Sequence, residues 1–173
     1  MGYAIAAALV TLVLISGAAG HALKPFVLRD ALRAHATVPE RFVRPLAVLV
    51  PVIEAVPAGL GAFGLLGGHD GALTAAMVCA AALMAGYGAY TWHVTRTSEA
   101  AVPCGCSAAG TPMTGWVPLR AVALAAVAAV AAGGAAHAAS VDAPDLLVAV
   151  LAGATLGALV WELPALAAPR PAN

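Results

Sequence analysis

The chain has 173 residues, of which 62% are hydrophobic and only 9% are charged, and its mean hydropathy is +0.95. A soluble domain has about 25% charged residues, so this chain cannot cover itself with polar surface. The formal net charge is zero, which gives no electrostatic footprint for binding nucleic acid. The composition therefore predicts an integral membrane protein, and the length suits a single domain over residues 1–173.

Five segments are long and apolar enough to span a bilayer, which takes about 20 mostly apolar residues. They are expected at about residues 3–20, 45–66, 73–92, 117–136 and 146–163. The first has no Lys or Arg before its apolar run, so it is expected to be a retained helix and not a signal peptide. The fourth is almost entirely Ala and Val, so four spans are the alternative. The predicted fold class is an all-α integral membrane helical bundle.

The stretch HALKPFVLRDALRAHATVPERFVRP follows the first predicted span and mixes basic with apolar residues. We expect it to lie along the membrane surface as a short amphipathic element. With five spans, this stretch, the third connection and the C-terminus share one side and hold all eight Lys and Arg. Basic residues are retained in the cytoplasm, so the N-terminus is predicted outside and the C-terminus inside.

Two cysteines, Cys104 and Cys106, lie in the longest connection, in the stretch VPCGCSAAG. Gly105 permits the turn that would bring the two sulfurs within disulfide range, and Pro103 fixes the backbone before the first sulfur. The resulting ring would be small and strained, and strained, exposed disulfides are exchange-active rather than structural. The pair therefore predicts thiol–disulfide exchange, on the cytoplasmic side if the charge rule holds.

Other side chains bear on this interpretation. No Lys, Arg or His lies within six residues of either cysteine, so a lowered thiol pKa would need Arg120 or His93 brought close by folding. One alternative is a Cu(I) or zinc site in which His93 or Met113 joins the two thiolates. The other is that both cysteines are inert loop residues.

Glu54 lies near the middle of the second predicted span, between Pro51 and Pro57. Intramembrane carboxylates are costly and usually face the bundle interior, so Glu54 is a candidate for proton transfer. The alternative is a neutral carboxyl that donates a hydrogen bond to a backbone carbonyl freed by the prolines. Cys79, inside the third span, is expected to be a buried small apolar residue.

Taken in order along the chain, these motifs resemble the methylamine utilisation protein MauE family, within a wider MauE/DoxX group of membrane proteins. The resemblance runs from about residue 14 to residue 131. It rests on LISGAAGHALKPFVLRDALRA, VPERFVRPLAVLVPVIEAVPAGLGA, CGCSAAG and GWVPLRA. The chain departs from the family at Ser107 and Ala108, where the family has Phe-Gly, and at Ala121, where it usually has Asn.

The resemblance implies a multi-pass protein of the bacterial inner membrane that exchanges disulfides with a thioredoxin-like partner. This exchange would support maturation of a disulfide-containing extracytoplasmic client, which in the family is the small subunit of methylamine dehydrogenase. If the protein is an enzyme, it is a thiol–disulfide oxidoreductase; no metal is expected, and a quinone is the one possible cofactor. The alternative is a non-enzymatic membrane assembly factor. The residues expected to act are Cys104, Cys106 and Glu54, supported by Pro103, Gly105, His93 and Arg120.

Overall fold

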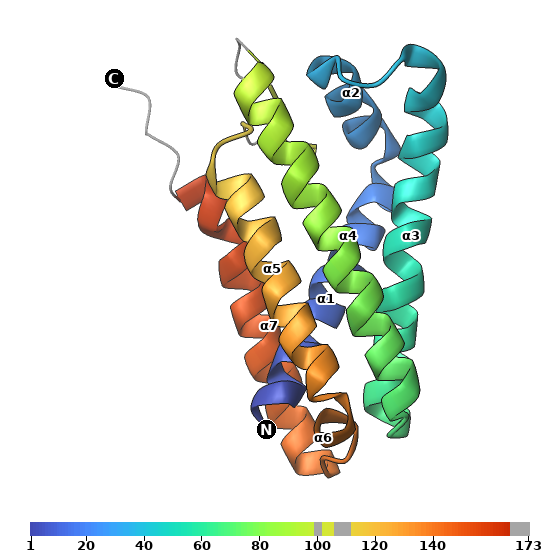
Figure 1. The fold of residues 1–173 in the computed structure, drawn as a ribbon, viewed down its shortest axis with the longest axis vertical. Coiled ribbons are helices and arrows are strands. Elements are labelled where there is room, and N and C mark those ends of the chain that lie inside the picture. Colours follow the sequence, from blue (N-terminus) through green and yellow to red (C-terminus); the bar gives the residue numbers. More distant parts are fainter. Residues whose placement is uncertain (99–101, 106–111, 167–173) are drawn as a thin grey trace.

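The computed structural model describes residues 1–98, 102–105 and 112–166, with residues 163–166 by their backbone only. Within this part of the chain there are seven helices, and five of them are long and apolar enough to cross a membrane. The prediction of an all-α bundle with five spans is confirmed. The five are α1 (Gly2–Leu23), α3 (Glu40–Gly67), α4 (Asp70–Thr97), α5 (Trp116–Gly133) and α7 (Ala143–Leu166), packed side by side with alternating direction (Figure 1).

The boundaries of the spans differ from those expected from hydropathy alone. α3 begins at Glu40 and continues through Pro45, Pro51 and Pro57. Proline removes a backbone donor from a helix, but neighbouring helices and side chains can compensate the freed carbonyls inside a membrane bundle. α5 ends earlier than predicted, at the pair Gly133-Gly134, because glycine is a poor helix former. The ring of Tyr3 fills the space where a side chain at position 134 would lie. A short helix, α6 (Ala135–Ala139), follows this break.

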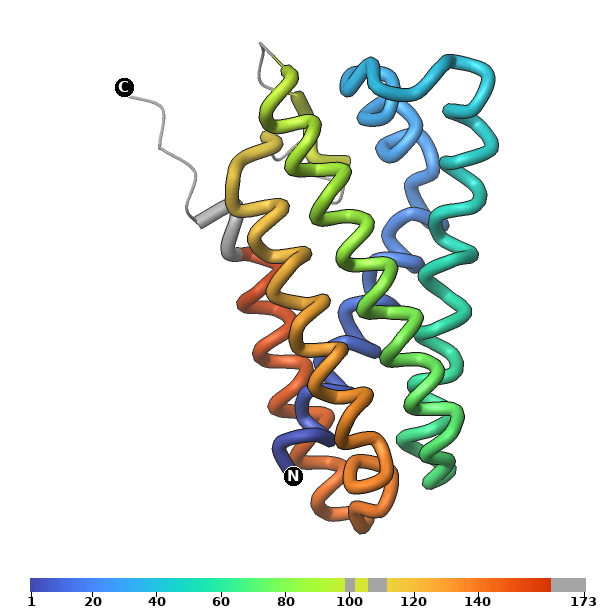
Figure 2. Tube along the Cα trace, in the orientation of Figure 1, coloured from blue at the N-terminus to red at the C-terminus, as the bar shows by residue number. Residues whose placement is uncertain are grey.

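The predicted amphipathic element is present as α2 (Pro25–His35), which packs against α3 at one end of the bundle (Figure 2). Ala31 and Leu32 are buried on its inner side. Arg33 donates hydrogen bonds of 2.8 and 2.5 Å to Glu40 Oε1 at the start of α3. This contact raises the pKa of the Arg33 guanidinium above its usual value. A charged arginine, hydrogen-bonded to Glu40, therefore connects α2 to the start of α3.

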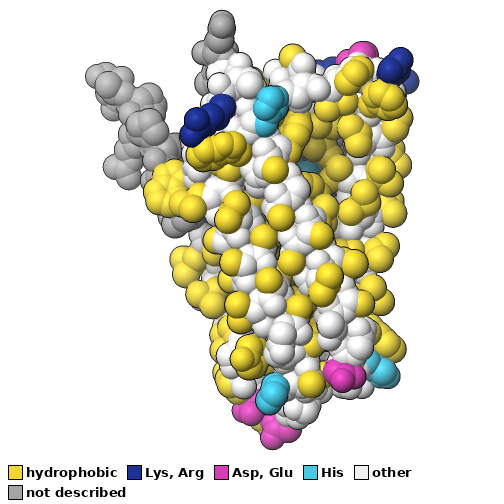
Figure 3. Space-filling view, viewed as in Figure 1, with side chains coloured by type: hydrophobic (Ala, Val, Ile, Leu, Met, Phe, Trp, Pro, Cys, Tyr) yellow, Lys and Arg dark blue, Asp and Glu magenta, His cyan; other side chains and the backbone are white. Residues whose placement is uncertain are grey.

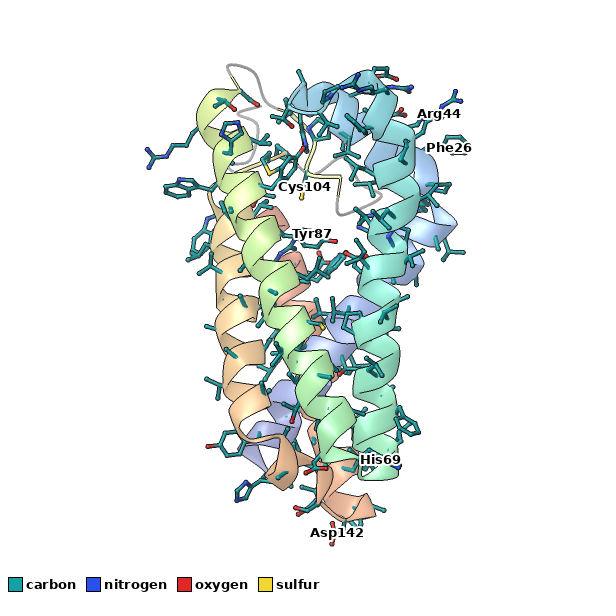
Figure 4. The ribbon with its side chains drawn as sticks, turned by 45° about the vertical axis from the view of Figure 1, so that its right-hand side comes forward. Phe26, Arg44, His69, Tyr87, Cys104 and Asp142 are labelled. Carbon is teal, nitrogen blue, oxygen red and sulfur yellow. The ribbon has the colours of Figure 1, made fainter. Side chains whose placement is uncertain are left out.

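Charged residues are divided unequally between the two ends of the bundle (Figure 3). The end that carries α2 holds all the described basic residues, with Asp30, Glu40 and Glu162. The opposite end, where α3 meets α4 and α6 meets α7, holds acidic residues and histidines (Figure 4). The basic residues at the first end are Lys24, Arg29, Arg33, Arg41, Arg44, Arg96 and Arg120. They lie on one side of the bundle, as predicted, and we call this the basic end.

Small residues allow the central helix α1 to lie close to its neighbours. A Cβ added at Gly61 of α3 would lie 2.5 Å from Thr11 Oγ1 of α1. A Cβ added at Gly153 of α7 would lie 2.7 Å from the backbone nitrogen of Leu9. Close approach through small residues is the usual way in which membrane helices associate, since burial from lipid gives little driving force. The α1–α7 contact therefore depends on Gly153.

We predict that Gly153→Ala lowers the free energy of unfolding by about 1–3 kcal/mol, because the obstructing atom belongs to the backbone of α1 and cannot move aside locally. Gly86→Ala is the matched control, since a Cβ there meets nothing within 4 Å. It should be neutral or slightly stabilising, because alanine favours helix more than glycine does. Unfolding in mixed detergent micelles, followed by circular dichroism, measures both variants. Equal stability of the two variants would contradict the prediction.

Candidate functional site

A cavity of about 320 Å³ lies inside the bundle near its basic end. This volume falls within the range of about 300–1,000 Å³ that is typical of small-molecule sites. All five spans, α2 and the segment around Cys104 contribute to its walls, which are mostly apolar. The polar side chains that line it are His21, His35, Glu54, Tyr87, Tyr90, Thr91 and Arg120.

Glu54 lines this cavity and is only 4% exposed. The Tyr87 hydroxyl donates a 3.0 Å hydrogen bond to its Oε1, and His21 Nε2 lies 3.8 Å from the same oxygen. The other oxygen, Oε2, is buried and has no hydrogen-bond partner among the described residues. A Cβ at Gly17 would lie 3.3 Å from Oε2, so the glycine leaves room beside it.

The structure does not support the alternative in which Glu54 donates to a carbonyl freed by the prolines of α3. No hydrogen bond of this kind forms from either carboxyl oxygen within the described part of the chain. The carboxyl group instead contacts α4 through Tyr87 and α1 through His21. It therefore faces the interior of the bundle, between α1, α3 and α4.

Cys104 lines the same cavity and is 8% exposed. The chain on either side of it is held by an antiparallel bridge between Pro103 and Pro112 and by a 2.7 Å hydrogen bond from Met113 N to Val102 O. In Figure 4, Cys104 lies near Tyr87, within the space between α3 and α4. The first cysteine of the pair therefore turns into the membrane bundle. Cys106 lies outside the described residues.

Gly105 is required at its position for two reasons. Its φ is +76°, a left-handed conformation that glycine adopts without steric cost. A Cβ there would also lie 2.7 Å from Cβ of Ala31, which is buried on the inner side of α2. Helix α2 therefore rests directly on the backbone that follows Cys104.

His35 fixes the other side of this backbone. Its Nε2 lies 2.8 Å from the carbonyl oxygen of Pro103, and its Nδ1 lies 2.9 Å from the Tyr90 hydroxyl. A carbonyl oxygen can only accept, so Nε2 must carry the proton and donate. In the neutral imidazole, Nδ1 then accepts from Tyr90, whose oxygen accepts from Thr37 Oγ1 at 3.0 Å. This chain of hydrogen bonds links α2 and α4 to the residue before Cys104, and we call it the His35 clamp.

Four residues of the site were not predicted from the sequence: His35, Tyr90, Tyr87 and His21. Each acts through a partner that is distant in sequence, with separations of 55 residues for His35–Tyr90 and 33 for Glu54–Tyr87. The only sequence feature that points to these residues is a polar aromatic or imidazole side chain within an otherwise apolar segment. Such residues usually have a partner when they are buried.

The remaining predicted residues lie in different places. Arg120 lines the cavity, with its guanidinium 5.4 Å from the ring centroid of Trp161 and Nη1 donating to Trp161 O at 3.4 Å. His93 is exposed on α4 and does not line the cavity. The structure therefore brings Glu54, Cys104 and Arg120 around one cavity, without His93. The expectation that Cys79 is buried is wrong: its side chain is exposed on the outer surface of α4.

We predict that His35→Ala accelerates alkylation of Cys104 by about fivefold or more, because each lost hydrogen bond is worth about 1 kcal/mol in holding the segment. The rate of reaction with N-ethylmaleimide would be measured in detergent, in a Cys79→Ser, Cys106→Ser background. His93→Ala is the matched control, since this imidazole is exposed and does not line the cavity. An unchanged rate in His35→Ala would show that the clamp does not restrain Cys104.

Comparisons with curated proteins and with solved structures give no match. A comparison with protein families matches residues 1–136 to the family described as Methylamine utilisation protein MauE. The match extends from α1 through the Cys104 segment to α5, and thus includes most of the cavity-lining residues. With its five apolar spans, the chain is therefore a multi-pass membrane protein that belongs to the MauE family.

Proposed function

We propose that this protein is a membrane thiol–disulfide redox protein in which Cys104 and Cys106 alternate between dithiol and disulfide. The observation that supports the proposal most is the placement of Cys104 in the wall of a cavity that also contains Glu54. Gly105 and the His35 clamp fix the backbone on both sides of this cysteine. A cysteine that served only as loop packing would not need such support.

In the proposed reaction, a thiolate of a thioredoxin-like partner attacks the Cys104–Cys106 disulfide and forms a mixed disulfide. The second thiol of the partner then attacks the mixed disulfide and displaces the cysteine of this protein. This step leaves an oxidised partner and a reduced cysteine pair. Two electrons and two protons pass to this protein in each cycle. Arg120 lies on the cavity wall, where its charge would favour a thiolate, and Glu54 would exchange protons with the site. The client would be a disulfide-containing extracytoplasmic protein of methylamine utilisation, so with the cysteine pair at a cytoplasmic end the protein would have to carry electrons across the membrane to act on it.

We predict that Cys104→Ser and Cys106→Ser each abolish exchange with reduced thioredoxin, used as the probe, because neither variant can form the intramolecular disulfide. Cys79→Ser is the matched control and should keep full exchange, since Cys79 lies on the outer surface of α4. Exchange is measured from the redox state of thioredoxin after gel-shift labelling of its thiols.

A double serine variant that still matures its client in cells would contradict the proposal. That outcome would favour the alternative function, a membrane assembly factor without redox chemistry. Immunoblotting of membrane fractions has to show that each variant accumulates to the same level as the wild-type protein.

We also propose that the basic end faces the cytoplasm of a bacterial inner membrane, because Lys and Arg are retained on that side. The prediction uses single cysteines at two exposed positions, Lys24→Cys at the basic end and His137→Cys at the other, in a variant without native cysteines. A membrane-impermeant maleimide should label His137→Cys in intact cells. It should label Lys24→Cys only after the membrane is opened. The reverse pattern would show the opposite orientation.

A further inference from the structure

We propose that the cavity binds the ring of a lipophilic quinone, and that Glu54 Oε2 accepts a hydrogen bond from its reduced form, the hydroquinone. The inference rests on the proposed function, since the quinone would be the electron acceptor for Cys104 and Cys106.

The first observation is the buried oxygen Oε2 of Glu54, which lacks a hydrogen-bond partner within the described residues. Buried polar atoms without a partner are rare in folded proteins and often mark a site for a ligand or an ordered water. Gly17 keeps the space beside Oε2 open, because any side chain there would come within about 3.3 Å of it. A ligand that donates a hydrogen bond from a hydroxyl group would satisfy this oxygen.

The second observation is the apolar character of the cavity and of the surface around it. Figure 3 shows a hollow between α3 and α4 near the basic end, bordered by hydrophobic side chains. Val50 of α3 and Met84 of α4 line the cavity, and Val48 and Val52 are exposed on the outer face of α3. A molecule dissolved in the bilayer can therefore approach without passing through water. Tyr87, Tyr90 and Trp161 also line the cavity, and aromatic side chains are suited to packing against a planar ring.

The third observation is that Cys104 and Glu54 share this one cavity. A ring bound in this cavity would therefore share it with both the thiol and the carboxylate. An acyl chain of a phospholipid would match the apolar walls, but it has no hydroxyl to offer Glu54 and cannot accept electrons. A quinone provides both properties, because it takes up two electrons and two protons from a dithiol.

The redox step balances without a further reactant. The thiols of Cys104 and Cys106 lose two electrons and two protons and form a disulfide, while the quinone gains both electrons and both protons and becomes a hydroquinone. Glu54 would take up the proton released by the Cys104 thiol and pass it to the nearer ring oxygen, and the resulting carboxylate would then accept the hydrogen bond from the new hydroxyl group. The disulfide is then ready to oxidise the next partner.

Binding is tested with purified wild-type protein in nanodiscs under anaerobic conditions. The probes are decylubiquinol, a benzohydroquinone, and menadiol, a naphthohydroquinone, and quenching of tryptophan fluorescence reports occupancy through Trp161. We expect saturable binding of at least one probe. Glu54→Gln should weaken it by about tenfold or more, as expected when a neutral amide oxygen replaces a charged acceptor. Glu162→Gln is the matched control: its side chain is exposed and does not line the cavity.

A photoactivatable quinone in wild-type protein keeps the test valid if Glu54→Gln does not fold. Crosslinks within residues 46–54 and 84–91 that decylubiquinone competes away would support the proposal. Crosslinks spread over the outer faces of the helices and insensitive to competition would overturn it. Equal affinity of wild type, Glu54→Gln and Glu162→Gln for both probes, or a phospholipid that neither probe displaces, would also overturn it.

Electron transfer is tested separately, by adding decylubiquinone or menadione to the fully reduced protein. The proposal requires that hydroquinone and the Cys104–Cys106 disulfide appear in equal amounts. If the protein exchanges with thioredoxin but reduces neither quinone, the quinone inference is wrong and the proposed function stands. If its cysteines react with neither thioredoxin nor quinone, the proposed function itself is wrong, and the inference fails with it.

Discussion

The burial of a carboxyl group inside an apolar bundle is the constraint on which the arrangement of this protein depends. Moving such a group out of water is costly unless neighbouring groups compensate it. Tyr87 from α4 and His21 from α1 approach Glu54 of α3, and Gly17 leaves space at its second oxygen. These contacts connect three helices at the carboxyl group, and the cavity lies beside it.

The Cys104 segment completes this interior from the basic end. Helix α2 lies on Gly105, and the His35 clamp holds the carbonyl of Pro103. The segment therefore connects two spans and also forms part of the cavity wall. Under the proposed function, a thiol in this position would exchange with a soluble partner on one side and with a membrane-dissolved molecule on the other. A cysteine pair on an exposed aqueous loop would not border the membrane interior in this way.

Much of the architecture follows from the sequence, because a bilayer accepts few kinds of backbone. Hydropathy predicts the five spans, and the mixture of basic and apolar residues predicts α2. The extension of α3 back to Glu40 was not predictable from hydropathy, since those first residues are polar and tied to α2 through Arg33. The polar pairs of the site were not predictable either, because each joins helices that a sequence cannot place side by side. Cys79 was wrongly predicted to be buried, because an almost uniformly apolar helix does not indicate which of its faces points inward.

The unequal distribution of charge between the two ends has an energetic consequence in a living cell. A membrane potential acts on each elementary charge moved across it with about 2.3 kcal/mol per 100 mV. With the basic end on the negative side, Lys24 and its neighbours lie at low electrical energy, and Asp142 and Asp145 at the far end lie at low energy as well. In the inverted orientation, both the basic and the acidic residues would have a higher electrical energy. An energised membrane would therefore continue to hold the protein in the orientation set at insertion.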